Sequence, residues 1–147
     1  MSGPDAIVDT NIFVSARNPR EDGHAACRAL LEAIDSDKVQ AIVSTVTLAE
    51  LRAGFSPEEV PTVWRPLSAH LHSSPNYVVE AVDSDIAEAA GALRHSSRLT
   101  LPHALIVATG QVRRAKCVVT QDLELRKARI GLPIKKPSEF LLGISGG

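Results

Sequence analysis

The sequence predicts an α/β domain built on a mostly parallel sheet, and three observations lead to that fold class. Short apolar runs alternate along the chain with segments that have the apolar spacing of a helix. The apolar runs show no regular polar alternation, which is typical of strands covered on both faces. Strands separated by helices need crossover connections and therefore lie parallel. At 147 residues the chain fits a single domain with a sizeable core.

The first half of the chain begins with an apolar run that starts at Ala6 and stops abruptly at Asp9. We expect a buried strand there, followed by a helix that starts near Ile12. The next predicted elements are a helix over His24–Ile34, a strand over Val39–Val43, and a helix capped by Ser44 or Thr45 that stops at Gly54.

The second half repeats this alternation. Pro61 and Pro66 interrupt a helical stretch, which predicts one helix or two short ones. Pro102 suits the first turn of an apolar and largely buried helix. The predicted elements are helix Pro57–His72, strand Tyr77–Val82, a helix capped by Asp83 or Ser84 through Leu93, helix Leu101–Val112, strand Lys116–Thr120, a short helix to Ala128, strand Ile130–Ile134 and helix Pro137–Leu142.

Composition narrows the function classes. Hydrophobic residues make up 44% of the chain and aromatic residues only 3%, so the core is aliphatic and base-stacking platforms are disfavoured. Cys27 and Cys117 do not form a C-x-x-C pair and are interpreted as buried thiols of a reducing compartment. We find no signal peptide, and the uncharged stretch Leu99–Val112 is too short to cross a bilayer. A soluble, cytoplasmic protein is expected.

Basic residues are concentrated in one stretch, although the net charge is only −1. Eight of the 16 Lys and Arg residues fall between Arg113 and Lys136, against Asp122 and Glu124 as the acids there. A basic face suits a polyanion whose backbone must be held. An ordinary solvated surface explains the same pattern, and by itself the stretch favours that interpretation.

Three acidic residues stand where a parallel sheet gathers ligand sites. Asp9 follows the first strand and Asp122 follows the strand at Lys116–Thr120, so both belong to the carboxyl edge of the sheet. Glu50 lies about two turns into the helix after the second strand, which returns it toward that edge. The alternatives are a helix N-cap for Asp9 and an ordinary surface position for Glu50.

Four short motifs in order resemble a known family. They are Val8-Asp9-Thr10-Asn11, Thr47-Leu48-Ala49-Glu50-Leu51, Leu101-Pro102-His103-Ala104-Leu105-Ile106-Val107-Ala108-Thr109 and Val119-Thr120-Gln121-Asp122. Together they are similar to the motifs of PIN domains, and within that family to VapC-type toxins. The resemblance covers residues 5–142 and implies a single domain over residues 1–147, a three-layer α/β/α sandwich around a mostly parallel sheet.

The resemblance also implies a function. It implies an endoribonuclease that depends on Mg²⁺ or Mn²⁺, with Asp9, Glu50 and Asp122 as metal-binding acids. Thr10, Asn11 and Thr120 would orient the carboxylates or bound waters. Clustered carboxylates stay ionised together only when a cation neutralises them, and hard oxygen ligands select these ions. The implied partners are an RNA substrate, an antitoxin protein and a second copy of the chain in a homodimer.

His103 departs from the family pattern, because the family usually has an aspartate at that position. Three outcomes are open. His103 binds the metal through a ring nitrogen and shifts the preference toward Mn²⁺ or other transition ions over Mg²⁺; or the three acids bind metal weakly and the chain retains slow activity; or the chain binds RNA or an antitoxin without catalysis.

Overall fold

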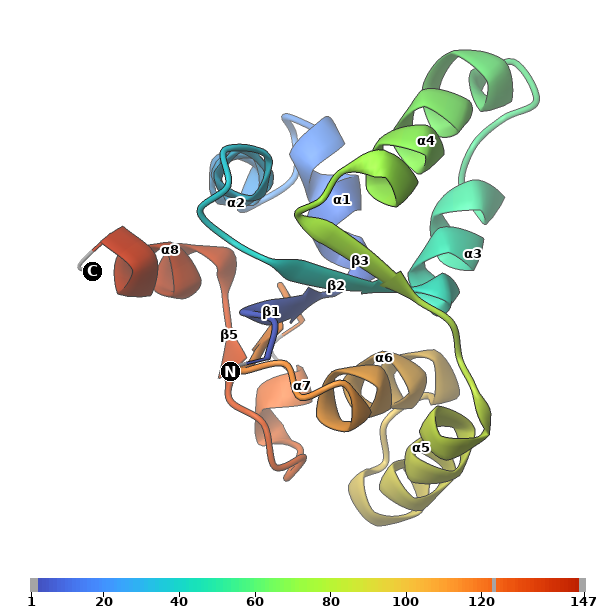
Figure 1. Cartoon of the computed structure of the whole chain (residues 1–147), viewed down its shortest axis with the longest axis vertical. Helices are drawn as coiled ribbons and strands as arrows, with labels where there is room; N and C mark the ends of the chain where they lie inside the picture. The colour runs from blue at the N-terminus through green and yellow to red at the C-terminus, as the bar shows by residue number, and fades with distance from the viewer. Residues whose placement is uncertain (1–2, 123, 146–147) are drawn as a thin grey trace.

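The computed structural model describes residues 3–122 and 124–145, and its centre is a five-stranded sheet (Figure 1). The strands lie in the order β3-β2-β1-β4-β5, and all neighbours are parallel. Their bounds are β1 Ala6–Val8, β2 Ala41–Ser44, β3 Tyr77–Glu80, β4 Val118–Val119 and β5 Ile134–Lys135. The predicted parallel α/β fold is therefore confirmed.

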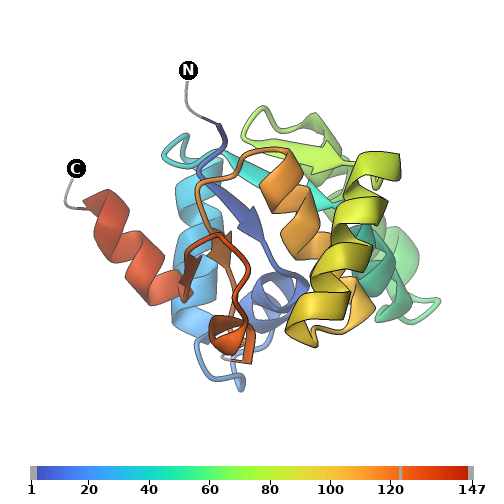
Figure 2. The same ribbon diagram turned by 90° about the horizontal axis from the view of Figure 1, so that it is seen from below.

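Helices cover both faces of the sheet and complete the predicted three layers (Figure 1). Their bounds are α1 Thr10–Arg17, α2 His24–Asp35, α3 Thr45–Ala53, the π-turn η1 Val60–Trp64, α4 Arg65–Ser73, α5 Ser84–Ser97, α6 Leu101–Val112, α7 Glu124–Lys127 and α8 Pro137–Ser145. On one face lie α1, α2, α4 and α8, and on the other lie α5, α6 and α7. Figure 2 shows α8 and α5 at opposite flanks of the molecule.

The alternation of side chains along each strand produces two separate hydrophobic cores. In β1, Ala6 and Val8 face the layer of α1 and α2, whereas Ile7 faces the layer of α5 and α6. All three side chains are completely buried. Gly110 lets α6 approach the sheet closely, because a Cβ there would lie 2.7 Å from Cγ2 of Ile7. The central strand is thus covered on both faces, as its apolar sequence predicts.

Helix capping explains where the helices begin. Ser44 ends β2 and accepts a hydrogen bond from the Val46 amide, so that α3 starts directly at the sheet edge. Thr100 caps α6 in the same way, and Pro102 occupies its first turn, where a missing amide proton costs little. The predicted starts of α3 and α6 agree with these caps.

Several predicted segments differ from the structure in their bounds: β4 is shorter than the predicted Lys116–Thr120, and β3 ends at Glu80 rather than Val82. Strand β5 comprises only Ile134–Lys135, because the Ile130 carbonyl accepts a hydrogen bond from the Gln111 side chain and Gly131 turns with φ +74°. The predicted strand over Ile130–Ile134 is therefore wrong for its first four residues. The helical stretch that contains Pro61 and Pro66 forms two short helices, η1 and α4, and each proline lies in the first turn of its helix.

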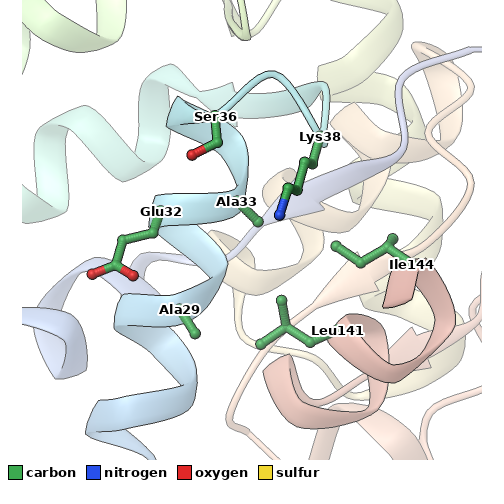
Figure 3. Close-up of a pocket in the computed structure, with 7 residues that line it drawn as sticks. All are labelled: Ala29, Glu32, Ala33, Ser36, Lys38, Leu141 and Ile144. Carbon is green, nitrogen blue, oxygen red and sulfur yellow. The ribbon is translucent and has the colours of Figure 1, made fainter. Parts of the chain in front are cut away.

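A groove of about 570 Å³ separates α2 from α8 (Figure 3). Ala29 and Ala33 of α2 line it opposite Leu141 and Ile144 of α8, and Lys38 stands at its rim. None of the predicted site residues belongs to this groove. Among the described residues, no helix has both the length and the apolar character needed to cross a membrane.

Candidate functional site

Asp9 is the most buried of the predicted site residues, with 1% of its surface exposed. It directly follows β1 and caps α1, and its Oδ1 accepts a hydrogen bond of 2.8 Å from the Thr10 amide. The helix N-cap interpretation of Asp9 is therefore confirmed, and Asp9 lies at the end of a buried strand as predicted, while its role as a ligand stays a prediction. Capping uses one carboxylate oxygen and leaves Oδ2 directed at other partners.

The second oxygen of Asp9 is held by side chains from two elements. Thr120 Oγ1 donates to Oδ2 over 2.7 Å, and Asn11 Nδ2 donates to the same oxygen over 3.2 Å. Thr120 Oγ1 in turn accepts from Asn11 Nδ2 and from the Asp122 amide, over 3.1 and 3.0 Å. Thr120 thus joins the end of β4 to the end of β1 and fixes the backbone at Asp122.

His103 lies between the two aspartates. Its Nε2 is 3.9 Å from Asp9 Oδ2 and 3.7 Å from Asp122 Oδ2. The His103 side chain is 30% exposed and that of Asp122 28%, so the group opens to solvent on this side. The Thr100 cap places His103 in the first turn of α6, which brings the imidazole to the carboxyl edge of the sheet. The position that departs from the family pattern therefore belongs to the site.

Glu50 reaches the site through Thr10. Thr10 Oγ1 donates to Glu50 Oε1 over 2.7 Å and lies 2.9 Å from Thr47 Oγ1. Because Thr10 has a single hydroxyl proton, Thr47 is the donor in the second contact. Glu50 is exposed, and it touches the residue next to Asp9 rather than Asp9 itself. Helix α3 therefore presents a third carboxylate at the rim of the site.

Electrostatics favour a positive charge here. Burial raises the pKa of the Asp9 carboxyl above its ordinary value, and the nearby charge of Glu50 raises it further. The Thr120 hydrogen bond, His103 and the Thr10 amide act in the opposite direction without cancelling the effect of burial. A buried carboxylate with a raised pKa gains stability from a cation that keeps it ionised.

The donor set has the chemistry of a divalent-cation site. Asp9, Asp122 and Glu50 supply carboxylate oxygens and His103 supplies a ring nitrogen, and oxygen-rich sets of this kind hold Mg²⁺ or Mn²⁺ with water completing the coordination. Within residues 3–122 and 124–145, no three His, Cys, Asp or Glu side chains converge closely enough to hold one ion as they stand. Glu50 in particular is exposed and hydrogen-bonded to Thr10.

Two polar contacts at the site are missing from the sequence-based prediction. Thr47 supports Thr10, and it lies three residues before Glu50 on the same helix face, a spacing that marks it as a neighbour. Gln121 Nε2 donates to Ser15 Oγ over 2.6 Å and to the Asp22 carbonyl over 3.1 Å. Nothing in the sequence links Gln121 to Ser15, because the contact depends on how α1 packs against β4.

Half of the basic residues between Arg113 and Lys136 are paired with acids. The ion pairs are Arg113 with Glu80 and Asp83, Lys116 with Asp5, Arg126 with Glu139, and Lys127 with Glu124. Moreover, Lys116 precedes β4, whereas the site lies beyond its carboxyl end. This supports the interpretation of the stretch as a solvated surface.

Comparisons with known proteins agree with this architecture. The model of the PIN domain family matches residues 6–131. A chain of a toxin-antitoxin complex from Klebsiella pneumoniae is 28% identical, with a TM-score of 0.66 over 90% of this chain and 98% of that one. No curated protein matches the sequence.

Two more distant structures share the fold. FitAcB from Neisseria gonorrhoeae is 20% identical, with a TM-score of 0.66 over 90% of this chain and 98% of that one. VapC20 from Mycobacterium tuberculosis, described as a sarcin-ricin loop cleaving toxin, is 17% identical, with a TM-score of 0.64 over 86% of this chain and 96% of that one. The fold is thus that of VapC-type toxins, and the chain belongs to the PIN domain family.

Proposed function

We propose that the chain is a metal-dependent endoribonuclease that hydrolyses RNA phosphodiester bonds and acts as the toxin of a toxin–antitoxin pair. The observation that carries the proposal is the environment of Asp9. This carboxylate is buried, its pKa is raised, and a second acid and an imidazole stand within 4 Å of each other beside it. Asp9 lies at the carboxyl edge of a parallel sheet, and ligand sites in such folds are usually found at that edge.

In this proposal Asp9, Asp122 and Glu50 would hold Mg²⁺ or Mn²⁺, with the His103 ring nitrogen as a further donor. The chemistry that the ion supplies when bound is polarisation of a phosphoryl oxygen and activation of a water as nucleophile. An imidazole among oxygen ligands favours Mn²⁺ over Mg²⁺. The role of His103 is thus to tune the choice of cation.

The remaining polar side chains hold the acids in place. Thr120 and Asn11 both donate to Asp9 Oδ2, while the Thr10 amide holds Oδ1. Thr10 Oγ1 holds Glu50 by a second hydrogen bond. These donors favour the ionised carboxylates and restrict their rotation, which reduces the cost of organising the site when a cation and a phosphodiester bind.

The comparisons support an antitoxin partner. The Klebsiella pneumoniae structure is a toxin-antitoxin complex, and VapC20 is described as a toxin that cleaves the sarcin-ricin loop. By analogy, we propose an antitoxin that covers the carboxylates, an RNA substrate, a homodimeric toxin and a cytoplasmic location.

A second candidate function is an RNA- or partner-binding PIN domain with weak or no catalysis. The observation that favours it is the imidazole that replaces an expected acid. The His103 imidazole lies 3.9 and 3.7 Å from the two aspartates, so the site offers a divalent ion one carboxylate fewer than the family pattern. Such a site would bind divalent ions weakly.

One experiment separates the two functions. The purified protein and His103→Asp are incubated with RNA in Mg²⁺ and in Mn²⁺, and metal affinity is measured by calorimetry on the same samples. A nuclease cleaves RNA in at least one of the two metals, and EDTA stops it. If the wild type leaves diverse RNAs intact in both metals while His103→Asp cleaves them, the chain is the non-catalytic relative. If the substitution changes neither metal affinity nor cleavage, His103 does not contact the ion.

A further inference from the structure

A cavity of about 580 Å³ adjoins the site of Asp9, His103 and Asp122. The proposed binding of a cation gives this cavity no role. Its walls come from the turn between α5 and α6 and from α7. Its lining includes Arg98 and Leu99 of that turn, Leu125 and Lys127 of α7, and the site residues His103 and Asp122. Its volume lies in the range of ordinary ligand pockets. A molecule held at Asp122 could therefore extend directly into it.

Arg98 has an unusual backbone conformation for its residue type. It ends α5 with φ 62° and ψ 15°, in the left-handed region where glycine is the usual residue. Its side chain is exposed, and no ion-pair partner for it is found among the described residues. Glycine adopts this left-handed conformation most easily, so the backbone of the turn gives no reason for an arginine at this position.

Of the described basic residues that line the cavity, Arg98 is the one without an ion-pair partner, and the acids Asp122 and Glu124 line it as well. Lys127, the other basic residue of the wall, is bound to Glu124 over 3.1 Å. The floor is apolar, since Leu99 is 7% exposed and Leu125 1%. A cation at the rim of an apolar floor suits a nucleotide, whose phosphate pairs with the guanidinium while its sugar and base cover the leucines.

We propose that this cavity is a substrate subsite in which Arg98 binds a backbone phosphate of the RNA strand, next to the phosphodiester that a cation at Asp9 and Asp122 would bind. The inference rests on the proposed function and deepens it, because it says where the strand leaves the carboxylates. Arg98 acts by binding and positioning the substrate.

The chain contains a matched control. Arg114 is also an arginine in the left-handed conformation, with φ 61°, and it is exposed. It follows the far end of α6 and precedes β4, on the side of the sheet away from His103. Arg98→Gly and Arg114→Gly therefore make the same chemical change in the same backbone conformation, at opposite edges. Both variants should keep a melting temperature no lower than that of the wild type, because glycine relieves the left-handed backbone.

The test is the affinity for a short fluorescein-labelled single-stranded RNA, measured by anisotropy in Mg²⁺ and in EDTA, with the RNA checked on a gel. Loss of one phosphate contact lowers the slope of log affinity against log salt by about 0.7, which at 0.15 M salt corresponds to an affinity about fourfold weaker. Arg98→Gly should show both effects, Arg98→Lys should retain most of the affinity, and Arg114→Gly should match the wild type.

The outcomes distinguish the subsite from the function. If the wild type cleaves RNA and Arg98→Gly binds it with unchanged affinity and salt slope, the subsite is wrong and the nuclease stands. Equal losses in Arg98→Gly and Arg114→Gly also overturn the subsite, since they would reflect net charge alone. If the wild type neither binds nor cleaves RNA in either condition, the proposed function and the subsite fail together.

Discussion

Thr120 provides a sharp test of how the site is held together. Its hydroxyl donates to Asp9 Oδ2 over 2.7 Å and accepts from the Asp122 amide over 3.0 Å. Thr120→Val keeps the shape of the side chain and removes both of these interactions, together with the hydrogen bond of 3.1 Å that the hydroxyl accepts from Asn11 Nδ2. A hydrogen bond to a charged group contributes about 1.5–3 kcal/mol, and the orphaned amide adds to the loss where water cannot replace its acceptor. We expect the free energy of unfolding to fall by about 2–4 kcal/mol in total.

Urea denaturation and thermal melting measure this effect, with Thr109→Val as the matched control. Thr109 is as buried as Thr120, at 0% and 2% exposure, but its hydroxyl donates only to the Leu105 carbonyl within α6. Its replacement should cost at most about 1 kcal/mol. A loss of 2–4 kcal/mol corresponds to a melting temperature lower by about 6–12 °C for a chain of this size. Equal losses in the two variants would refute the role assigned to Thr120.

Further predictions concern the packing of α6 and the titration of Asp9. Gly110→Ala should destabilise the protein by about 1–3 kcal/mol in urea denaturation, because its Cβ would lie 2.7 Å from Ile7. Gly91→Ala, on the exposed side of α5 with nothing within 4 Å, should instead stabilise it by about 1 kcal/mol, and a gain at both sites would contradict the close approach. Burial raises the pKa of Asp9 above 3.8, so its contribution to stability is complete below pH 3.8 and is lost as pH rises through the higher pKa of the folded state. Without metal, the free energy of unfolding of the wild type should therefore fall relative to that of Asp9→Asn as pH rises from 3.8 through the pKa of the folded state. If the difference in unfolding free energy between the two proteins does not change with pH, the pKa of Asp9 is not raised.

Much of the fold follows from local sequence signals. The run from Ala6 to Val8 lacks polar alternation because both faces of β1 are covered. The start of α3 follows from Ser44, since a hydroxyl at a strand end satisfies the first free amides of a helix. The start of strand β5 is harder to predict from the sequence. Ile130 is buried like a strand residue, but its carbonyl accepts a hydrogen bond from a side chain of α6. Hydrophobicity alone does not distinguish those situations.

The sequence names the residues of the candidate site but not the contacts that join them. The order of the motifs led to Asp9, Glu50, His103 and Asp122, and the structure brings His103 within 4 Å of both aspartates. What the sequence does not contain is the rotamer of each side chain. Glu50 contacts Thr10 rather than Asp9. Which of the two residues it contacts depends on the packing of α3 against α1, two helices that are far apart in the sequence.

The most direct measurement of the central claim is RNA cleavage by the purified protein in Mg²⁺ or Mn²⁺, followed with and without EDTA beside Asp9→Asn. Asp9 is the buried acid on which the proposed cation site depends. We expect the wild type to cleave RNA, and both the chelator and the substitution to abolish cleavage. Cleavage that persists in EDTA, or in Asp9→Asn at the rate of the wild type, would contradict a metal-dependent nuclease built on this carboxylate.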